Sequence, residues 1–344
     1  MKLPSTRLLV VVIVALVLVI IGIVAFGVTS SNKNTGPIPT PVVEEPSLNI
    51  SVQDVEAKDD LTDATYSRTR GMFYVSSVDE SLLYVINPDT GKIDSTIQTP
   101  NPSRLLFSAD ESVLYTTDGE IVRKLSTATF DTEVEVKVSK GTYAMALTND
   151  NKYLFVVNEY TDSVAILNPD TLVAIKYIAV ERRPVDVAMS ADGQYAFVAN
   201  YDSGSITKIA LSNLTVVGTI QELGRPVKLI TYTPQDLILV LDEYGGQIIA
   251  LRSDNNEVVG TIEAVHYPSD FSLDTDNNRI YVASYTDGEI GVVDIAMERV
   301  VKVVPLNSSL GKVAGLNIVI YAPGKNLLLA TNTNYGEIKL VGIK

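Results

Sequence analysis

The segment DVAMSADGQYAFVAN, Asp186–Asn200, decides the fold because the chain repeats it. It aligns without gaps to DFSLDTDNNRIYVAS, Asp270–Ser284, and to AMALTNDNKYLFVVN, Ala144–Asn158. Fainter copies start at Asp63, Ser103, Lys228 and Ile318, so the successive starts lie 40, 41, 42, 42, 42 and 48 residues apart. Seven units of about 42 residues are typical of an architecture in which each unit is one supersecondary element.

Each unit reads as four short β-strands. The runs DVAMS and YAFVAN are joined by the turn Ala191-Asp192-Gly193, a composition suited to a tight reversal. A third run such as SVAILN from Ser163 and a fourth such as VVGTIQ from Val216 complete a unit. No helical periodicity of any length follows Val28.

The repeats predict an all-β fold, a seven-bladed β-propeller of four-stranded antiparallel blades over residues 47–344. An open solenoid is the alternative, but it would need polar capping units at both ends, and the sequence shows none. The seventh unit supplies only three strands, ending with Glu337–Ile343. We therefore expect the strand-like run Leu48–Val55 to complete the last blade and close the ring.

An apolar segment precedes the repeats. Leu8–Val28 runs for 21 residues without a charged or strongly polar side chain. As a helix it would be about 31 Å long, which predicts a single transmembrane span. A cleaved signal peptide is the alternative, with Ala25-Phe26-Gly27 as its cleavage site, but its apolar core would be shorter.

The charges around this segment predict its orientation. Lys2 and Arg7 precede it, and Lys33 alone follows closely. The positive-inside rule then places residues 1–7 in the cytoplasm and the propeller outside the cell membrane, anchored by residues 8–28. Residues 29–46 are rich in Ser, Thr, Asn and Pro and are expected to form a semi-rigid stalk.

Composition excludes several kinds of chemistry. The chain has no cysteine, which rules out disulfides, cysteine-ligated metals and a thiol nucleophile, and His266 is its only histidine. We expect no metal, no cofactor and no catalytic residue. Residues 47–344 carry 24 basic and 39 acidic side chains, a formal net charge of −15, which argues against nucleic acid or anionic lipid as a partner.

The repeat also resembles a known family. Arg183-Pro184, Ser190-Ala191-Asp192-Gly193 and Phe197-Val198-Ala199-Asn200 together resemble the YVTN-type β-propeller repeat. The resemblance extends over residues 48–344, although Thr69-Arg70 and Gly324-Lys325 replace the Asp-Gly pair in the first and seventh copies. It implies cell-surface and surface-layer-like proteins, with lactonases and redox enzymes as structural relatives.

The loops between the second and third strands, and those entering each first strand, should share one rim of the propeller. Tyrosines recur in the first set and arginines in the second, which makes these the candidate binding residues: Tyr160, Tyr201, Tyr244, Tyr285, Tyr335, Arg183 and Arg225. The tyrosines could form an aromatic ring for sugars or for a partner's side chains, or they could simply pack in turns. The arginines could clamp a carboxylate or remain solvated. Six extra residues within Pro305–Asn317 enlarge the same rim.

Charged residues also recur at the first position of the unit. Asp63, Asp186 and Asp270 occupy it in three copies, and Lys228 occupies it in another. The carboxylates could hold a hard cation, but ion pairing with Lys228 is the simpler interpretation. Asp274, Asp276 and Asn277 look like part of a calcium loop, yet they coincide with the turn of the repeat and are interpreted as turn residues.

These observations favour a membrane-anchored surface domain that binds an envelope protein or a glycan without catalysis. A lactonase-like metal-dependent hydrolase and a structural subunit of a surface lattice are the alternatives, and the sequence leaves the oligomeric state open. Outside the cell, three sequons are candidates for glycosylation: Asn49, Asn213 and Asn307.

Overall fold

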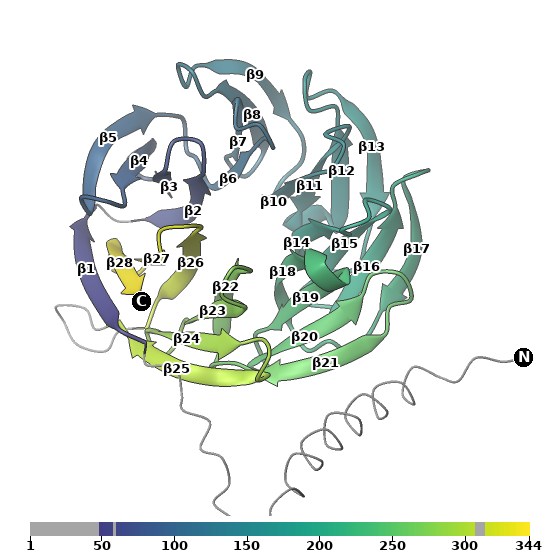
Figure 1. The fold of residues 1–344 in the computed structure, drawn as a ribbon. Helices are drawn as coiled ribbons and strands as arrows, with labels where there is room; N and C mark the ends of the chain where they lie inside the picture. Colours follow the sequence, from purple (N-terminus) through teal and green to yellow (C-terminus); the bar gives the residue numbers. More distant parts are fainter. Residues whose placement is uncertain (1–47, 58–59, 307–313) are drawn as a thin grey trace, which may run out of the picture. The chain divides into compact units, whose positions relative to one another are not determined.

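The computed structural model describes residues 48–57, 60–306 and 314–344. Within these ranges the chain forms seven four-stranded antiparallel sheets. Figure 1 shows them as blades around a central axis, with the first strand of blades 1 to 6 innermost and the fourth outermost. The predicted seven-bladed β-propeller is thereby confirmed.

The strands are named by blade, from the inside outward. Blade 1 contains β2 (Leu61–Ser67), β3 (Met72–Ser77), β4 (Leu82–Asn87) and β5 (Lys92–Gln98); blade 2 contains β6 (Arg104–Phe107), β7 (Val113–Thr117), β8 (Ile121–Ser126) and β9 (Thr132–Lys137). Blade 3 contains β10 (Thr142–Leu147), β11 (Leu154–Asn158), β12 (Ser163–Leu167) and β13 (Ala174–Ala179); blade 4 contains β14 (Pro184–Met189), β15 (Tyr195–Asn200), β16 (Ser205–Ala210) and β17 (Thr215–Ile220). Blade 5 contains β18 (Pro226–Tyr232), β19 (Leu237–Asp242), β20 (Gln247–Arg252) and β21 (Val258–Glu263); blade 6 contains β22 (Pro268–Asp274), β23 (Arg279–Ser284), β24 (Glu289–Asp294) and β25 (Arg299–Pro305). Blade 7 contains β26 (Leu316–Ala322), β27 (Leu327–Asn332), β28 (Glu337–Ile343) and β1 (Ile50–Glu56), and two single turns of 3-10 helix are η1 (Glu159–Thr161) and η2 (Thr233–Gln235).

The core lies between the blades rather than within one central layer. All residues of β11 and β19 are buried, because a middle strand packs against a neighbouring blade on each face. Phe155, Val187 and Val198, for example, belong to one apolar cluster that blades 3 and 4 share. This packing explains why the middle strands read as continuous apolar runs rather than as alternating ones.

A β-bulge near the start of the innermost strand sets which residue occupies the first repeat position. In blade 4, Pro184 pairs with Asn200 and Asp186 with Ala199, so that Val185 is the extra residue. Blades 1, 5, 6 and 7 repeat this irregularity. Bulges redirect side chains, and here the residue after the bulge is Asp63, Asp186, Lys228, Asp270 or Ile318.

Blade 2 corrects the predicted repeat by one residue. Arg104 pairs with Thr117 there, and the amide of Ser108 bonds the carbonyl of Val113 as the amide of Ser190 bonds that of Tyr195. Arg104, not Ser103, is therefore equivalent to Asp186. The gap-free alignment missed this because it started the copy one residue early, whereas a start at Arg104 places Ser108-Ala109-Asp110 opposite Ser190-Ala191-Asp192.

The predicted closure of the ring is confirmed. Strand β1 pairs with β28 in an antiparallel register from Ile50 opposite Ile343 to Glu56 opposite Glu337. Figure 1 shows the two ends of the coloured chain meeting in this blade. The sequence predicted the run Leu48–Val55, and the strand is shifted from it by one residue at its C-terminal end and two at its start.

Three predictions fall outside the described residues. They are the transmembrane segment 8–28 with its flanks, the centre of the long connection 305–317, and the sequon at Asn307. Among the residues that are described, none lies in a helix long and apolar enough to cross a membrane.

Candidate functional site

The tyrosine rim is the edge of the propeller that carries the loops between second and third strands and the connections entering each first strand. Its loops contact one another across blades. The amide of Arg183, at the entry to blade 4, donates to Oδ1 of Asp162 in blade 3 at 2.8 Å. The amide of Arg225 donates to Oδ1 of Asp242 at 2.8 Å. Both arginines thus stand on a fixed backbone.

A glycine leaves room for the hydrogen bond between the Arg225 amide and Asp242. Gly224 precedes Arg225 and has a φ of 67°. A Cβ atom at this position would fall 2.2 Å from Oδ1 of Asp242, so any other residue would displace the carboxylate that orients the Arg225 amide.

The structure brings together four of the predicted binding residues: Arg183, Tyr201, Arg225 and Tyr244. With Glu159 and Glu243 they form a group that we call the arginine–tyrosine cluster. The guanidinium carbon of Arg183 lies 4.6 Å from the ring centroid of Tyr201, and that of Arg225 lies 5.5 Å from it. Arg225 also lies 5.9 Å from the ring centroid of Tyr244. Such arginine–aromatic stacking is worth about 0.5–1 kcal/mol per pair at exposed sites.

Carboxylates of the rim hold this stack in place. Arg183 Nε donates to Glu159 Oε1 at 2.7 Å, and Asp202 lies 3.6 Å away. Tyr201 donates its hydroxyl proton to Glu243 Oε2 at 2.5 Å. The hydrogen bond from Arg183 to Glu159 raises the pKa of the guanidinium, and burial, with the bond to Glu243, raises the pKa of Tyr201. The charge of Arg183 is therefore paired within the protein, although Arg183 and Arg225 are both exposed to solvent.

The remaining predicted tyrosines lie on the same rim but outside the cluster. Tyr160 covers Gly141, where a Cβ atom would fall 2.9 Å from the ring, and its side chain is 75 % exposed. Within the cluster, Tyr244 is similarly exposed, at 74 %. Tyr285 and Tyr335 are also exposed, and no contact between them and the arginines is found in the described part of the chain.

A second charged group, the channel cluster, lines the inner strands. It comprises Asp63, Arg104, Asp186, Lys228 and Asp270. Each aspartate accepts a hydrogen bond from a backbone amide of the following blade: Leu105 at 2.7 Å, Leu229 at 2.7 Å and Val319 at 3.0 Å. The carboxylates therefore join innermost strands across the blade boundaries.

Lys228 is the cation that these carboxylates share. Its Nζ lies 3.5 Å from Oδ1 of Asp270, as the ion-pair interpretation predicted. The charge of Asp270, with those of Asp186 and Asp63, raises the pKa of Lys228 against the effect of burial. Burial raises the pKa of all three aspartates, and Lys228 opposes that rise at each.

Arg104 belongs to the same cluster, although the repeat alignment did not find it. Its Nη1 donates to the carbonyls of Thr62 at 2.8 Å and Ser103 at 2.9 Å, and its guanidinium lies 4.0 Å from the ring centroid of Tyr143. A search for charged residues one position away from each predicted start would have identified it.

The described residues contain no group of three or more His, Asp or Glu side chains placed to hold a metal ion. Asp274 acts as a turn residue, as predicted. It accepts hydrogen bonds from the backbone and side-chain nitrogens of Asn277 at 3.1 and 2.8 Å and from the Tyr281 hydroxyl at 3.1 Å.

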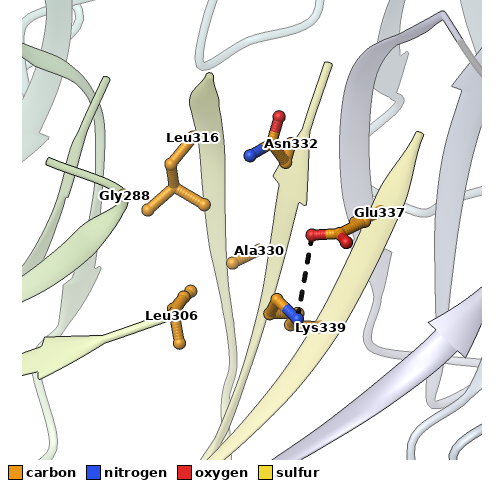
Figure 2. A pocket seen from close by; sticks show the side chains of 7 residues that line it. All are labelled: Gly288, Leu306, Leu316, Ala330, Asn332, Glu337 and Lys339. Atoms are coloured by element: carbon orange, nitrogen blue, oxygen red, sulfur yellow. Dashed lines mark ion pairs between the residues drawn. The ribbon is translucent and has the colours of Figure 1, made fainter. Parts of the chain in front are cut away.

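Figure 2 shows a small cavity between blades 6 and 7. Its volume is about 10 Å³, close to the space of one water molecule. Lys339 projects toward Glu337 there, with 3.8 Å between Nζ and Oε2, and also binds Asp54 of β1 at 2.5 Å. The cavity is too small for an organic ligand, and its charges serve the closure of the ring.

The sequons in the described residues lie on the surface. Asn49 and Asn213 are both exposed. The side-chain oxygen Oδ1 of Asn213 accepts a hydrogen bond from the hydroxyl of Thr215 at 2.8 Å. Their glycosylation stays a prediction.

Comparisons with known proteins agree with this architecture. Among solved structures, the β-propeller domain of Cps50 (Swd1) from Myceliophteria thermophila is 12 % identical, with a TM-score of 0.73 over 86 % of this chain and 100 % of that one. A streptogramin B lyase is 11 % identical, with a TM-score of 0.72 over 86 % of this chain and 98 % of that one. At these identities the likeness concerns the fold. No curated protein sequence matches. The family model for YNCE-like β-propellers matches residues 138–315, more than half of the 344 residues, so the chain belongs to the YNCE-like β-propeller family.

Proposed function

We propose that the propeller is a non-catalytic recognition module and that the arginine–tyrosine cluster is the centre of its binding surface for an envelope protein. The observation that carries this proposal is the stack itself, in which Arg183 and Arg225 both lie over the ring of Tyr201 while Tyr244 stays exposed beside them. Tyrosine and arginine are the residues that most often dominate binding energy at protein interfaces.

Order in the free protein supports the same proposal. Glu159, Asp162, Asp242 and Glu243 hold the arginines and Tyr201 through hydrogen bonds that need no partner. A surface whose side chains are already fixed loses less conformational entropy on binding than a mobile one. The exposed tyrosines lie among carboxylates, so the partner side of the interface should carry basic side chains.

Affinity capture from envelope extracts tests this surface. We expect the full chain carrying Arg183→Ala, Tyr201→Ala, Arg225→Ala and Tyr244→Ala to fold normally but to recover its partner at least about tenfold less than the native protein. The matched control is Tyr177→Ala, which removes an exposed tyrosine from the outer strand β13. Unchanged recovery would contradict the proposal, and loss of recovery on substitution around Asp192 and Asn213 would move the site to the opposite rim. Capture of a glycan in place of a protein would favour a glycan-binding role. Capture of a second copy of the chain would favour the role of a surface-lattice subunit.

The proposal includes a location outside the cell membrane, because residues 8–28 are apolar and the preceding residues are basic. Protease added to intact cells should cut within residues 29–46 and release a fragment of propeller size, whereas a cytoplasmic marker protein should survive. Complete protection of the chain in intact cells, with cleavage only after lysis, would contradict this location.

A further inference from the structure

A groove with a volume of about 580 Å³ opens between blades 3 and 4. It is lined by the turn from β10 to β11, the turn from β14 to β15 and the residues that follow β16. These segments lie on the rim opposite the tyrosine rim, because turns between first and second strands and between third and fourth strands share that edge. The volume is within the range of pockets that hold small molecules.

The groove presents two equivalent carboxylates in a fixed orientation. Asp150 Oδ1 accepts hydrogen bonds from the Thr148 hydroxyl at 2.7 Å and the Lys152 amide at 3.1 Å. Asp192 Oδ1 accepts the corresponding bonds from Ser190 at 2.6 Å and Gln194 at 2.9 Å. In both, the turn uses Oδ1, so Oδ2 is the oxygen available to a ligand. The bond from Thr148 lowers the pKa of Asp150, which keeps it an acceptor at neutral pH.

Two tyrosines accompany the carboxylates, each with a cation on its ring. Lys152 Nζ lies 4.9 Å from the centroid of Tyr153, and Lys208 Nζ lies 3.8 Å from that of Tyr195. Lys208 is itself 4 % exposed and donates to the carbonyl of Asp254 at 2.9 Å. Lys152 lines the groove together with Asp150 and Asp192, whereas Lys208 contacts the Tyr195 ring without lining the groove, so the groove presents charges of both signs.

The two sides of the groove are tied together. Asn149 of blade 3 donates through Nδ2 to the carbonyls of Ser190 at 3.1 Å and Ala191 at 3.2 Å in blade 4. This crossing fixes the distance between the two aspartate–tyrosine pairs, which lie at equivalent repeat positions in adjacent blades. A preorganised groove of this kind loses little entropy when it binds a ligand.

From this arrangement we infer that the groove binds a neutral saccharide. The free carboxylate oxygens and the Gln194 side chain supply acceptors and donors for several hydroxyl groups at once. Tyr153 and Tyr195 line the groove and supply apolar ring atoms, beside the lysines over their rings, for the C–H surface of a sugar. A uronic acid would meet the like charges of Asp150 and Asp192, and an amino sugar would meet that of Lys152, so a neutral sugar fits the groove better than either.

Saturation-transfer NMR on the full chain tests the inference. The neutral probes are methyl α-D-glucopyranoside, methyl β-D-galactopyranoside, methyl N-acetyl-β-D-glucosaminide, maltotriose and cellotriose, and the charged probes are methyl glucuronide and methyl glucosaminide. We expect at least one neutral probe to bind. Asp150→Asn combined with Asp192→Asn should weaken it at least about tenfold, because two hydrogen bonds to charged acceptors become neutral ones.

The matched control is Asp110→Asn in blade 2, where Ser108 and Ser112 make the same kind of turn with Oδ1 but Asp110 does not line the groove. This variant should bind the probe as the native chain does. The inference is overturned if no neutral probe binds, if the charged probes bind better, or if the double variant and the control bind equally well. The quadruple variant of the arginine–tyrosine cluster should keep saccharide binding, which separates this site from the proposed protein-binding surface.

Discussion

A chain that lacks residues 48–56 is expected to unfold at least about 10 °C below the intact protein and to aggregate in a concentration-dependent way. The deletion removes β1 and leaves the edge of β28 unpaired, and exposed sheet edges pair readily with other chains. It also removes Asp54, which binds the buried ammonium of Lys339. Lost backbone pairing and lost apolar burial together should cost about 5 kcal/mol or more. Calorimetry and light scattering measure the two effects.

Two valines of β1 provide a matched pair of point substitutions. Val55 is 5 % exposed and belongs to the apolar cluster between blades 7 and 1, whereas Val52 on the same strand is 46 % exposed. Val55→Ala should lower the free energy of unfolding by about 1–2 kcal/mol, and Val52→Ala should change it by less than about 0.5 kcal/mol. Equal melting temperatures for the deleted and intact chains would show that β1 does not close the ring.

Lys228→Met should be the most destabilising single substitution in the channel. It leaves Asp63, Asp186 and Asp270 without their shared cation. Removing one partner of a fully buried pair costs about 3–5 kcal/mol, and we expect about 2–3 kcal/mol here because the lysine side chain is 38 % exposed. The control is Lys325→Met, since Lys325 binds Asp89, whose side chain is 70 % exposed, and should cost less than about 1 kcal/mol.

The cost of Lys228→Met should depend on pH. Burial raises the pKa of the three aspartates above the usual 3.8. Such carboxyls favour folding below their unfolded pKa, and this contribution is lost as the pH rises through the folded value. Without Lys228 the folded pKa values should rise further, so the deficit relative to the native chain should be larger at pH 7.5 than at pH 5. A deficit that stays constant between these pH values, or that equals the Lys325→Met deficit, would contradict this role.

The repeat was sufficient to predict the architecture because the middle strands of the blades pack on both faces. This packing favours continuous apolar runs in the middle strands, and such runs recur from copy to copy. The spacing of the copies predicted seven blades, and the missing fourth strand of the last copy predicted the pairing of β1 with β28. Lys228 beside Asp270 was predicted as an ion pair for a similar reason, because equivalent positions of a radial repeat meet at the axis.

The same reasoning missed features that depend on a single residue of register or on contacts between blades. Arg104 was displaced by one position because the faint copy in blade 2 was aligned from Ser103, one residue before its structural equivalent of Asp186. The groove between Asp150 and Asp192 was not predicted, because each aspartate alone is an ordinary turn residue, and only the distance across the blade boundary makes them a pair. Arg183 likewise forms ion pairs with two carboxylates from neighbouring loops, those of Glu159 and Asp202.

The pairing of β1 with β28 also determines how late in synthesis the ring can close. Asp54 and its partner Lys339 are 285 residues apart in sequence, so one is made near the start of the propeller and the other near its end. At a translation rate of about 5–20 residues per second, the first strand waits roughly 15–60 seconds for its partner to be made. Six blades can form during that interval, but the ring cannot lock until the chain is almost complete. A truncated product released early would carry an open edge at both ends, which is the kind of species that cellular quality control removes.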